Sequence, residues 1–385
     1  MQYNGREIIL SLNKRHSLGI VAGITLFLVP LNLMFMLPLS GLIVLLCAGK
    51  YSLAGLSLTK ITLISLLFIL LSANLFFFKM EELAIAVPFL VYPAALMLVS
   101  VLNLERSFIF GMANAIFLVF LVDSVFNIYT LTTSSDLFGR RVDFRPGDVF
   151  PRLGGIYANS FISIGISMSA FIASLLTKNR IITFLVVCLM PLSGGMRSPV
   201  LLLVAVCGCI VAHFVKSRIT LFFLAIMCGS IVFGGIFLLS DVSSNALRIA
   251  ALTFGATEIF ESPLMGNSGY IPIDRVEGGG ITLDMLLESG NAEQQLMNIG
   301  IHFGIPLLLI FMTIIYSLIP RSNSKLNSDS EDLFVKRVSV FIIIVDLIVT
   351  HLFSFFPFTV FSLIILLRLG KSRPKTELTT LRLNV

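Results

Sequence analysis

Long apolar runs are the feature of this sequence that most constrains its fold. They recur along the 385 residues, with clear examples at 61–78, 84–102, 219–239 and 338–356. A helix needs roughly 20 mostly apolar residues to cross a bilayer, whereas a membrane β-barrel shows short alternating strands. Only 12% of the residues are charged, against about 25% in soluble domains. The sequence therefore predicts an all-α, polytopic transmembrane helical bundle that uses lipid as solvent for much of its surface.

Twelve membrane spans are expected, or ten to eleven if some of the short second, seventh and twelfth runs are re-entrant or interfacial. Their approximate bounds are 18–34, 36–48, 61–78, 84–102, 107–130, 159–176, 181–192, 199–215, 219–239, 294–318, 338–356 and 358–368. The first run has no small-residue cleavage site at its end, so we expect a retained span rather than a signal peptide. Residues 1–385 are predicted to form a single integral membrane domain, with a polar N-terminal segment 1–17 and a C-terminal tail 369–385.

The placement of Lys and Arg predicts the orientation of these spans. With the N-terminus inside, 19 of the 27 basic residues fall in inward segments and 8 in outward ones. Such a bias across short loops is the positive-inside signal, so both termini are expected to be cytoplasmic. The net charge of +6 reflects this bias, and no nucleic-acid partner is expected.

Two outward segments, approximately 131–158 and 240–293, are much longer than the other outward turns. Long connections in a compact protein are usually functional or disordered. The second segment has apolar residues at helical spacing, which predicts an amphipathic helix over 245–260 that is a candidate to lie on the membrane surface. The five cysteines all fall inside apolar runs, so neither a disulfide framework nor a metal site is expected.

The outward basic residues are mostly arginine, seven of the eight. The planar guanidinium fork suits bidentate recognition of phosphate. Four lie in the first long segment (Arg140, Arg141, Arg145 and Arg152), and the others are Arg197, Arg248 and Arg275. Alternatively, these side chains pair with nearby carboxylates or extend to lipid headgroups. We favour that alternative for Arg140, Arg141 and Arg145.

Four polar segments follow one another on the outward side between residues 145 and 310. They are R-L-G-G-I-Y-A-N-S from Arg152 to Ser160; the turn L-S-G-G-M-R-S, which contains Arg197; Arg248 followed by P-L-M-G from Pro263 to Gly266; and A-E-Q-Q-L, which contains Glu293 and precedes I-H-F-G-I-P.

In this order, the four segments resemble motifs of the O-antigen polymerase and ligase superfamily of bacterial integral membrane glycosyltransferases. The first is similar to the family's Arg-x-x-Gly-x-aromatic-x-Asn stretch, the second to its Ser-Arg turn, and the third to an Arg that precedes a Pro-Leu-Leu-Gly-like turn. The fourth is similar to the segment in which ligases carry His-Asn, and Glu293 in place of that His favours the polymerase branch. Two departures are the inserted Gly-Gly-Met of the second segment and Gly269, which follows Gly266 by three residues rather than two. The resemblance covers somewhat under half of the chain.

The resemblance implies an O-antigen polymerase of the bacterial inner membrane. Its partners would be undecaprenyl-pyrophosphate-linked oligosaccharide donor and acceptor, membrane lipid and a chain-length regulator protein. Arg248 and Glu293 would be catalytic, with Glu293 as the base, and Arg152 and Arg197 would bind pyrophosphate. The possible secondary residues are Arg145, Arg275, His302 and Asn159. No cofactor and no metal are expected. Position alone also allows a plain structural role for Glu293, because a carboxylate at a helix N-terminus is stabilised by the helix dipole.

Three other functions stay open at this point. One is the ligase of the same superfamily, and another is a structural or assembly factor without catalysis. The third is a flippase or other transporter of lipid-linked oligosaccharide, for which polar residues inside the spans would form a proton path. Those residues are Asp123, Asn127, His302 and Asp346. Asp123 and Asn127 are four apart and share a helix face. We favour interhelical hydrogen bonding as their role.

Overall fold

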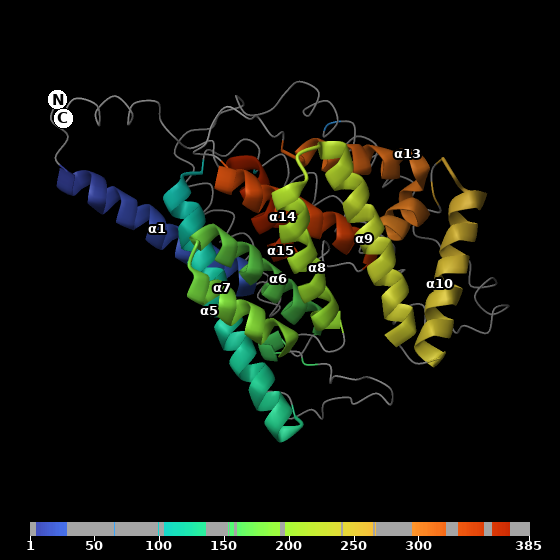
Figure 1. The fold of residues 1–385 in the computed structure, drawn as a ribbon, viewed down its shortest axis with the longest axis horizontal. Coiled ribbons are helices and arrows are strands. Elements are labelled where there is room, and N and C mark those ends of the chain that lie inside the picture. The colour runs from blue at the N-terminus through green and yellow to red at the C-terminus, as the bar shows by residue number, and fades with distance from the viewer. Residues whose placement is uncertain are drawn as a thin grey trace, which may run out of the picture.

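The computed structural model describes residues 5–28, 65, 99, 104–135, 153, 155–157, 160–192, 197–239, 242–264, 266, 295–320, 330–349 and 356–369. Every regular element within these ranges is a helix (Figure 1). The elements are α1 (Gly5–Leu28), α5 (Arg106–Thr133), the 3₁₀ turn η4 (Gly155–Tyr157), α6 (Ser160–Thr177), α7 (Arg180–Leu189), the 3₁₀ turn η5 (Met190–Leu192), α8 (Arg197–Phe214), α9 (Arg218–Leu239), α10 (Val242–Glu261), α13 (Gln295–Leu318), α14 (Ser330–Val349) and α15 (Phe356–Arg368).

The outer faces of these helices are apolar. On α9, one exposed stripe carries large hydrophobic side chains at intervals of four residues: Ile219, Phe223, Met227 and Ile231. A helix that is hydrophobic on its exposed side as well as its packed side requires an apolar solvent. Within the described residues, three helical stretches are long and apolar enough to cross a bilayer: Arg106–Thr133, Arg218–Ile236 and Ile299–Leu318. The predicted class of helical membrane protein is confirmed, and the number of spans and the identity of the outward face stay predictions.

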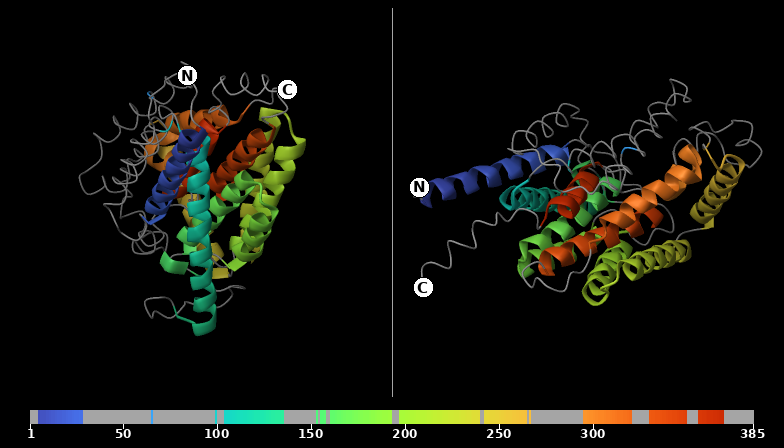
Figure 2. Two further views of the ribbon diagram at one scale, coloured as in Figure 1. Left: turned by 90° about the vertical axis from the view of Figure 1, so that its left-hand side faces the viewer. Right: turned by 90° about the horizontal axis from the view of Figure 1, so that it is seen from above.

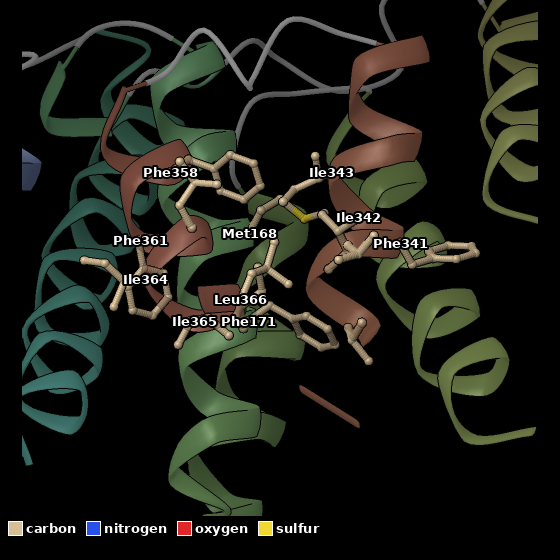
Figure 3. Close-up of a cluster of buried hydrophobic side chains, with 14 of the residues drawn as sticks. Met168, Phe171, Phe341, Ile342, Ile343, Phe358, Phe361, Ile364, Ile365 and Leu366 are labelled. Atoms are coloured by element: carbon tan, nitrogen blue, oxygen red, sulfur yellow. The ribbon is translucent and has the colours of Figure 1, made fainter. Parts of the chain in front are cut away.

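Helix α14 lies at the centre of the bundle, where it packs against α6, α8, α9, α13 and α15. Every residue from Val338 to Leu347 is buried. In Figure 3, Phe358 of α15 and Phe171 of α6 lie on one side of α14, and the Phe341 ring lies on its other side. There Phe341 faces Gly208 of α8. Because lipid is as apolar as these side chains, the cohesion of this core comes from close packing and dispersion rather than from exclusion of water.

Glycines bring the second half of α1 close to the first half of α5 (Figure 2, left). A Cβ built on Gly19 would lie 2.2 Å from the carbonyl oxygen of Phe108, and one built on Gly111 would lie 2.1 Å from that of His16. One turn after Gly19, Gly23 faces Ala115 in the same way. Small residues at such positions let two helix backbones approach, which is a common way for membrane helices to associate.

Ion pairs join helix ends that the sequence assigns to the inward side. Arg106, the first residue of α5, reaches Asp332 in the first turn of α14, with Nη2 3.0 Å from Oδ1. Three further contacts lie at ends with the same assignment: Arg15 with Glu105, Lys178 with Glu331, and Arg368 Nε with the carbonyl oxygen of Val99 at 2.7 Å. These helix ends are therefore neighbours.

Helix boundaries follow the apolar runs except at two places. Helix α1 starts at Gly5, well before the predicted first run, and α14 starts at Ser330, eight residues before the predicted run 338–356. The backbone hydrogen bonds of a helix can continue beyond its apolar residues. In the first turn of α14, Glu331 and Asp332 stabilise the helix because their negative charges lie at the positive end of its dipole. The predicted runs at 36–48, 61–78 and 84–102 lie outside the described residues, apart from positions 65 and 99.

Candidate functional site

A buried polar network connects α5 to α6. Asp123 and Asn127 lie one turn apart on α5, and both are fully buried, as is Ser163 on α6. Asn127 Nδ2 donates to Asp123 Oδ2 at 3.2 Å and to Ser163 Oγ at 3.1 Å. Ser163 Oγ in turn donates to Asp123 Oδ2 at 2.5 Å. The favoured prediction of interhelical hydrogen bonding is therefore confirmed for Asp123 and Asn127.

The same network holds the backbone of η4. The Gly155 N–H donates to Asn127 Oδ1 at 2.9 Å, and the Ile156 N–H donates to Asp123 Oδ1 at 3.1 Å. Gly155 has a φ of +55°, and a Cβ on it would lie 1.7 Å from Asp123 Oδ1. Two residues earlier, Leu153 is buried with an exposed fraction of 3%. Only glycine allows this backbone to approach the carboxylate so closely.

This arrangement gives a physical reason for the central glycine of the Arg152–Ser160 segment. In the sequence, Gly155 stands out only as part of a motif, and Asp123 and Asn127 stand out only as polar residues inside a span. Their contact joins positions about thirty residues apart, with separations of 28 and 33 for the two backbone hydrogen bonds. Nothing in local spacing pairs them, and the only sequence signal is that both lie at the predicted outer end of a span.

A second irregular segment, the turn after α10, packs into a break in α13. Helix α13 is broken at Gly304, which has φ +79° and ψ 175°, and Pro306 follows inside the helix. The turn after α10 occupies this break, because the Ile305 N–H donates to the carbonyl oxygen of Pro263 at 2.8 Å. Within the turn, the Gly266 N–H donates to the carbonyl oxygen of Ser262 at 2.9 Å. The Pro263–Gly266 segment and the Gly-Ile-Pro step of α13 therefore form one structural piece.

Two glycines with positive φ make that contact possible. A Cβ on Gly304 would lie 2.7 Å from the carbonyl carbon and oxygen of Leu264. A Cβ on Gly266, where φ is +67°, would lie 2.5 Å from the backbone of His302 and Phe303. At both positions backbone meets backbone, so no side-chain rotation can make room for a larger residue.

Helix α10 packs against the first half of α13. A Cβ on Gly255 would lie 2.8 Å from Met297 Sδ, and a Cβ on Gly300 would lie 2.8 Å from Ile259 Cδ1. Later positions on α10 meet later positions on α13, so the two helices run in the same direction until the turn at Pro263. α10 covers the predicted helix 245–260, which is thereby confirmed. Figure 2 (right) shows α10 beside one end of α13, at the edge of the molecule.

The position of Arg248 follows from the register of α10. Arg248 precedes Gly255 on α10 by seven residues, which is about two helical turns. At about 1.5 Å per residue, Arg248 lies about 10 Å before Gly255 along α10. Gly255 faces Met297, in the first turn of α13. Met297 is two residues, or about 3 Å, past the start of α13, so the Arg248 backbone lies about 7 Å before the first residue of α13 along the shared helix direction.

The other expected site residues are placed unevenly. Arg197 is the first residue of α8, and His302 lies on α13 beside the docked turn with an exposed fraction of 5%. The structure therefore brings the Arg248 position and His302 into the same α10–α13 unit. Arg145, Arg152, Asn159, Arg275 and Glu293 lie outside the described residues.

Buried acidic residues occur elsewhere in the described part of the chain. Asp346 on α14 has an exposed fraction of 1%, as does Glu258 on α10. Among the residues that the structure describes, no three His, Cys, Asp or Glu side chains gather in a way that would hold a metal ion.

Fold and site together define a polytopic helical membrane protein with two glycine-dependent irregular segments, each joined to a buried part of the bundle. No protein-family model matches the chain, and no curated protein matches it significantly.

Proposed function

We propose that this protein is a glycan polymerase that joins lipid-pyrophosphate-linked repeat units at the outward face of the bacterial inner membrane, as an O-antigen polymerase does. The observation that supports it most is the α10–α13 unit. Parts of two of the four polar segments, namely Arg248 with Pro263–Gly266 from the third and the Gly304 step from the fourth, belong to this one unit. A functional unit built from segments distant in the chain explains why these residue types occur together.

The proposed reaction is a glycosyl transfer. The bond between C1 of the donor sugar and the pyrophosphate oxygen breaks, and its electron pair leaves with the pyrophosphate. A hydroxyl oxygen of the acceptor sugar forms the new bond to C1, and its proton passes to the Glu293 carboxylate. Arg248 stabilises the charge that develops on the leaving phosphate oxygens, which preorganised donors do most effectively in a site shielded from water.

The register of α10 supports pairing Arg248 with Glu293. The Arg248 backbone lies about 7 Å before Gln295, the first residue of α13, along the shared helix direction, and Glu293 precedes Gln295 by two residues. Arg152 and Arg197 are proposed to bind the pyrophosphate. For Arg197, the start of α8 adds the positive end of a helix dipole, which favours an anion.

A transporter of lipid-linked oligosaccharide is the alternative with an observation in its favour, namely the buried Asp123, His302 and Asp346. Asp123, however, accepts hydrogen bonds from Asn127, Ser163 and the Ile156 backbone. Three hydrogen-bond donors fix a carboxylate in place and stabilise its ionised form. Such a group is suited to a structural role and is poorly suited to taking up and releasing a proton during transport. This observation favours the polymerase over the transporter. The ligase is disfavoured by Glu293, which replaces the His of that branch.

Deletion of the gene in its own bacterium, followed by electrophoresis of the surface polysaccharide, tests the proposal. Loss of a polymerase leaves lipid cores capped with a single repeat unit. Loss of a ligase leaves bare cores with polymer still on the lipid carrier, and loss of a transporter leaves bare cores with the repeat trapped inside. Either of the last two patterns overturns the proposed polymerase.

Point variants then test the site. Arg248→Ala and Glu293→Gln are expected to reproduce the single-repeat pattern while the protein still accumulates in the membrane. The matched control is Arg180→Ala, which removes an exposed arginine at the opposite predicted side and is expected to leave chain length unchanged. Normal chain lengths in both site variants would refute the assignment of these two residues.

A further inference from the structure

In the hydrogen-bond network around Asp123, every side-chain nitrogen and oxygen of Asp123, Asn127 and Ser163 has a partner. Asp123 accepts from Ile156 N through Oδ1, and from Asn127 Nδ2 and Ser163 Oγ through Oδ2. Asn127 accepts from Gly155 N through Oδ1 and donates through Nδ2 to Ser163 as well. Such fully satisfied buried networks specify one local geometry.

We propose that Asp123, Asn127 and Ser163 are positioning residues that hold the Gly155–Ile156 backbone at the predicted outer end of α5 and α6, and thereby limit the region that the preceding Arg152 can reach. Arg152 is joined to Leu153 by one peptide bond, so whatever holds Leu153 and Gly155 limits the positions open to Arg152. None of the three residues touches substrate. Their part in glycan transfer rests on the proposed function, whereas their hold on the backbone does not.

The choice of residue types supports a positioning role rather than simple helix association. Two membrane helices can associate through side-chain hydrogen bonds alone. Here one oxygen of each of the two α5 side chains is turned to a backbone N–H of η4 instead. Gly155 adopts a positive φ at the same place, and a Cβ on it would collide with Asp123. The hydrogen-bond network and the glycine therefore act together to hold the η4 backbone. Packing of α5 on α6 alone would require neither of them.

Exchange of the two side chains gives a sharp test. In Asp123→Asn, one carboxylate oxygen is replaced by an amide N–H₂. If the N–H₂ takes the place of Oδ2, it faces the donors Asn127 Nδ2 and Ser163 Oγ. If it takes the place of Oδ1, it faces the Ile156 N–H. In Asn127→Asp, a second carboxylate faces the first, and the donors to Asp123 and Ser163 are lost.

In the double variant Asp123→Asn with Asn127→Asp, every bond can form again. Asn at 123 accepts from Ile156 N and donates to residue 127 and Ser163. Asp at 127 accepts from Gly155 N, from residue 123 and from the Ser163 hydroxyl. The number of charges is also the same as in the original pair.

Hydrogen–deuterium exchange on the full-length protein in detergent measures the hold directly, because the Gly155 and Ile156 amides are the donors concerned. Each single variant is expected to speed exchange in the peptide that contains these amides by about tenfold or more, and the double variant to return it to within a few-fold of the original rate. Ser163→Ala, which removes one donor and one acceptor, is expected to give an intermediate rate and serves if a single variant fails to accumulate. Unchanged exchange in the singles, or a double variant as fast as the singles, overturns the proposal.

Surface polysaccharide from the same strains separates this inference from the proposed function. If both hold, chain length falls in the single variants and recovers in the double variant. If exchange shows the rescue but the deletion strain lacks the single-repeat pattern, the positioning network stands and the polymerase assignment fails. If the polymerase is established and exchange shows no rescue, the positioning network fails alone.

Discussion

Substitution of Gly304 by alanine is expected to separate the turn after α10 from α13. The conformation φ +79°, ψ 175° lies in a region open essentially to glycine only and costs another residue about 1–3 kcal/mol. The new Cβ would also lie 2.7 Å from the backbone of Leu264, so the turn must move. Movement breaks the hydrogen bond from Ile305 N–H to the Pro263 carbonyl, and a buried polar group left without its partner costs a further 1–3 kcal/mol, roughly. The sum is about 2–6 kcal/mol, a large fraction of the stability of most proteins.

Thermal unfolding of the purified protein in detergent measures this loss, and a fall in Tm of about 5 °C or more is expected. The matched control is Gly234→Ala on α9, where nothing lies within 4 Å of an added Cβ. That control should be neutral or should stabilise the protein by up to about 1 kcal/mol, because alanine is the better helix former. If Gly304→Ala and Gly234→Ala unfold at the same temperature, docking of the turn into the break does not contribute to stability and the reasoning is wrong.

Two further changes probe the bundle itself. Gly19→Leu is expected to push α1 away from α5, because its Cβ would meet the Phe108 carbonyl oxygen at 2.2 Å; cross-linking between cysteines placed on the two helices should weaken, and unaltered cross-linking would contradict the close approach. Arg106→Ala is expected to lower stability by about 1 kcal/mol or somewhat more, since it leaves the largely buried Asp332 carboxylate without its partner; Asp332→Asn in the same background should recover much of the loss in a thermal unfolding assay, and no recovery would show that the pair does not matter.

Hydropathy predicts the helices well because every span must be apolar and must satisfy its own backbone hydrogen bonds in lipid. An apolar run of about 20 residues has few structural options in lipid other than a helix, and α6, α8, α9 and α13 begin and end close to the predicted bounds. Hydropathy does not predict the start of a helix that extends beyond its apolar run, as α14 does. There Glu331 and Asp332 belong to the helix although they do not belong to an apolar run.

The site was predictable only in its parts. The sequence marks Gly155, Pro263–Gly266 and His302 as members of polar segments, and it places Asp123 and Asn127 on one helix face. The contact of Asp123 with Ile156, or of Pro263 with Ile305, depends on how distant segments fold together. Single-sequence periodicity carries no information about such pairs. The positive φ of Gly304 was likewise invisible, since glycine is common in apolar helices.

The two irregular segments share a physical cause that links fold to function. In an apolar surrounding, a backbone N–H or C=O outside a regular helix must find a partner within the protein, so irregular backbone persists only where it is buried or lines a cavity. At η4, side chains of α5 supply the partners, and at the break in α13 the turn after α10 supplies one. Both solutions require a glycine whose Cβ would collide with the partner. A bundle that served only to span the membrane could replace both segments with continuous helix at lower cost. Both lie in segments that contain an arginine predicted to face outward, Arg152 in one and Arg248 in the other, which favours a site that needs fixed, non-helical backbone to position charged groups.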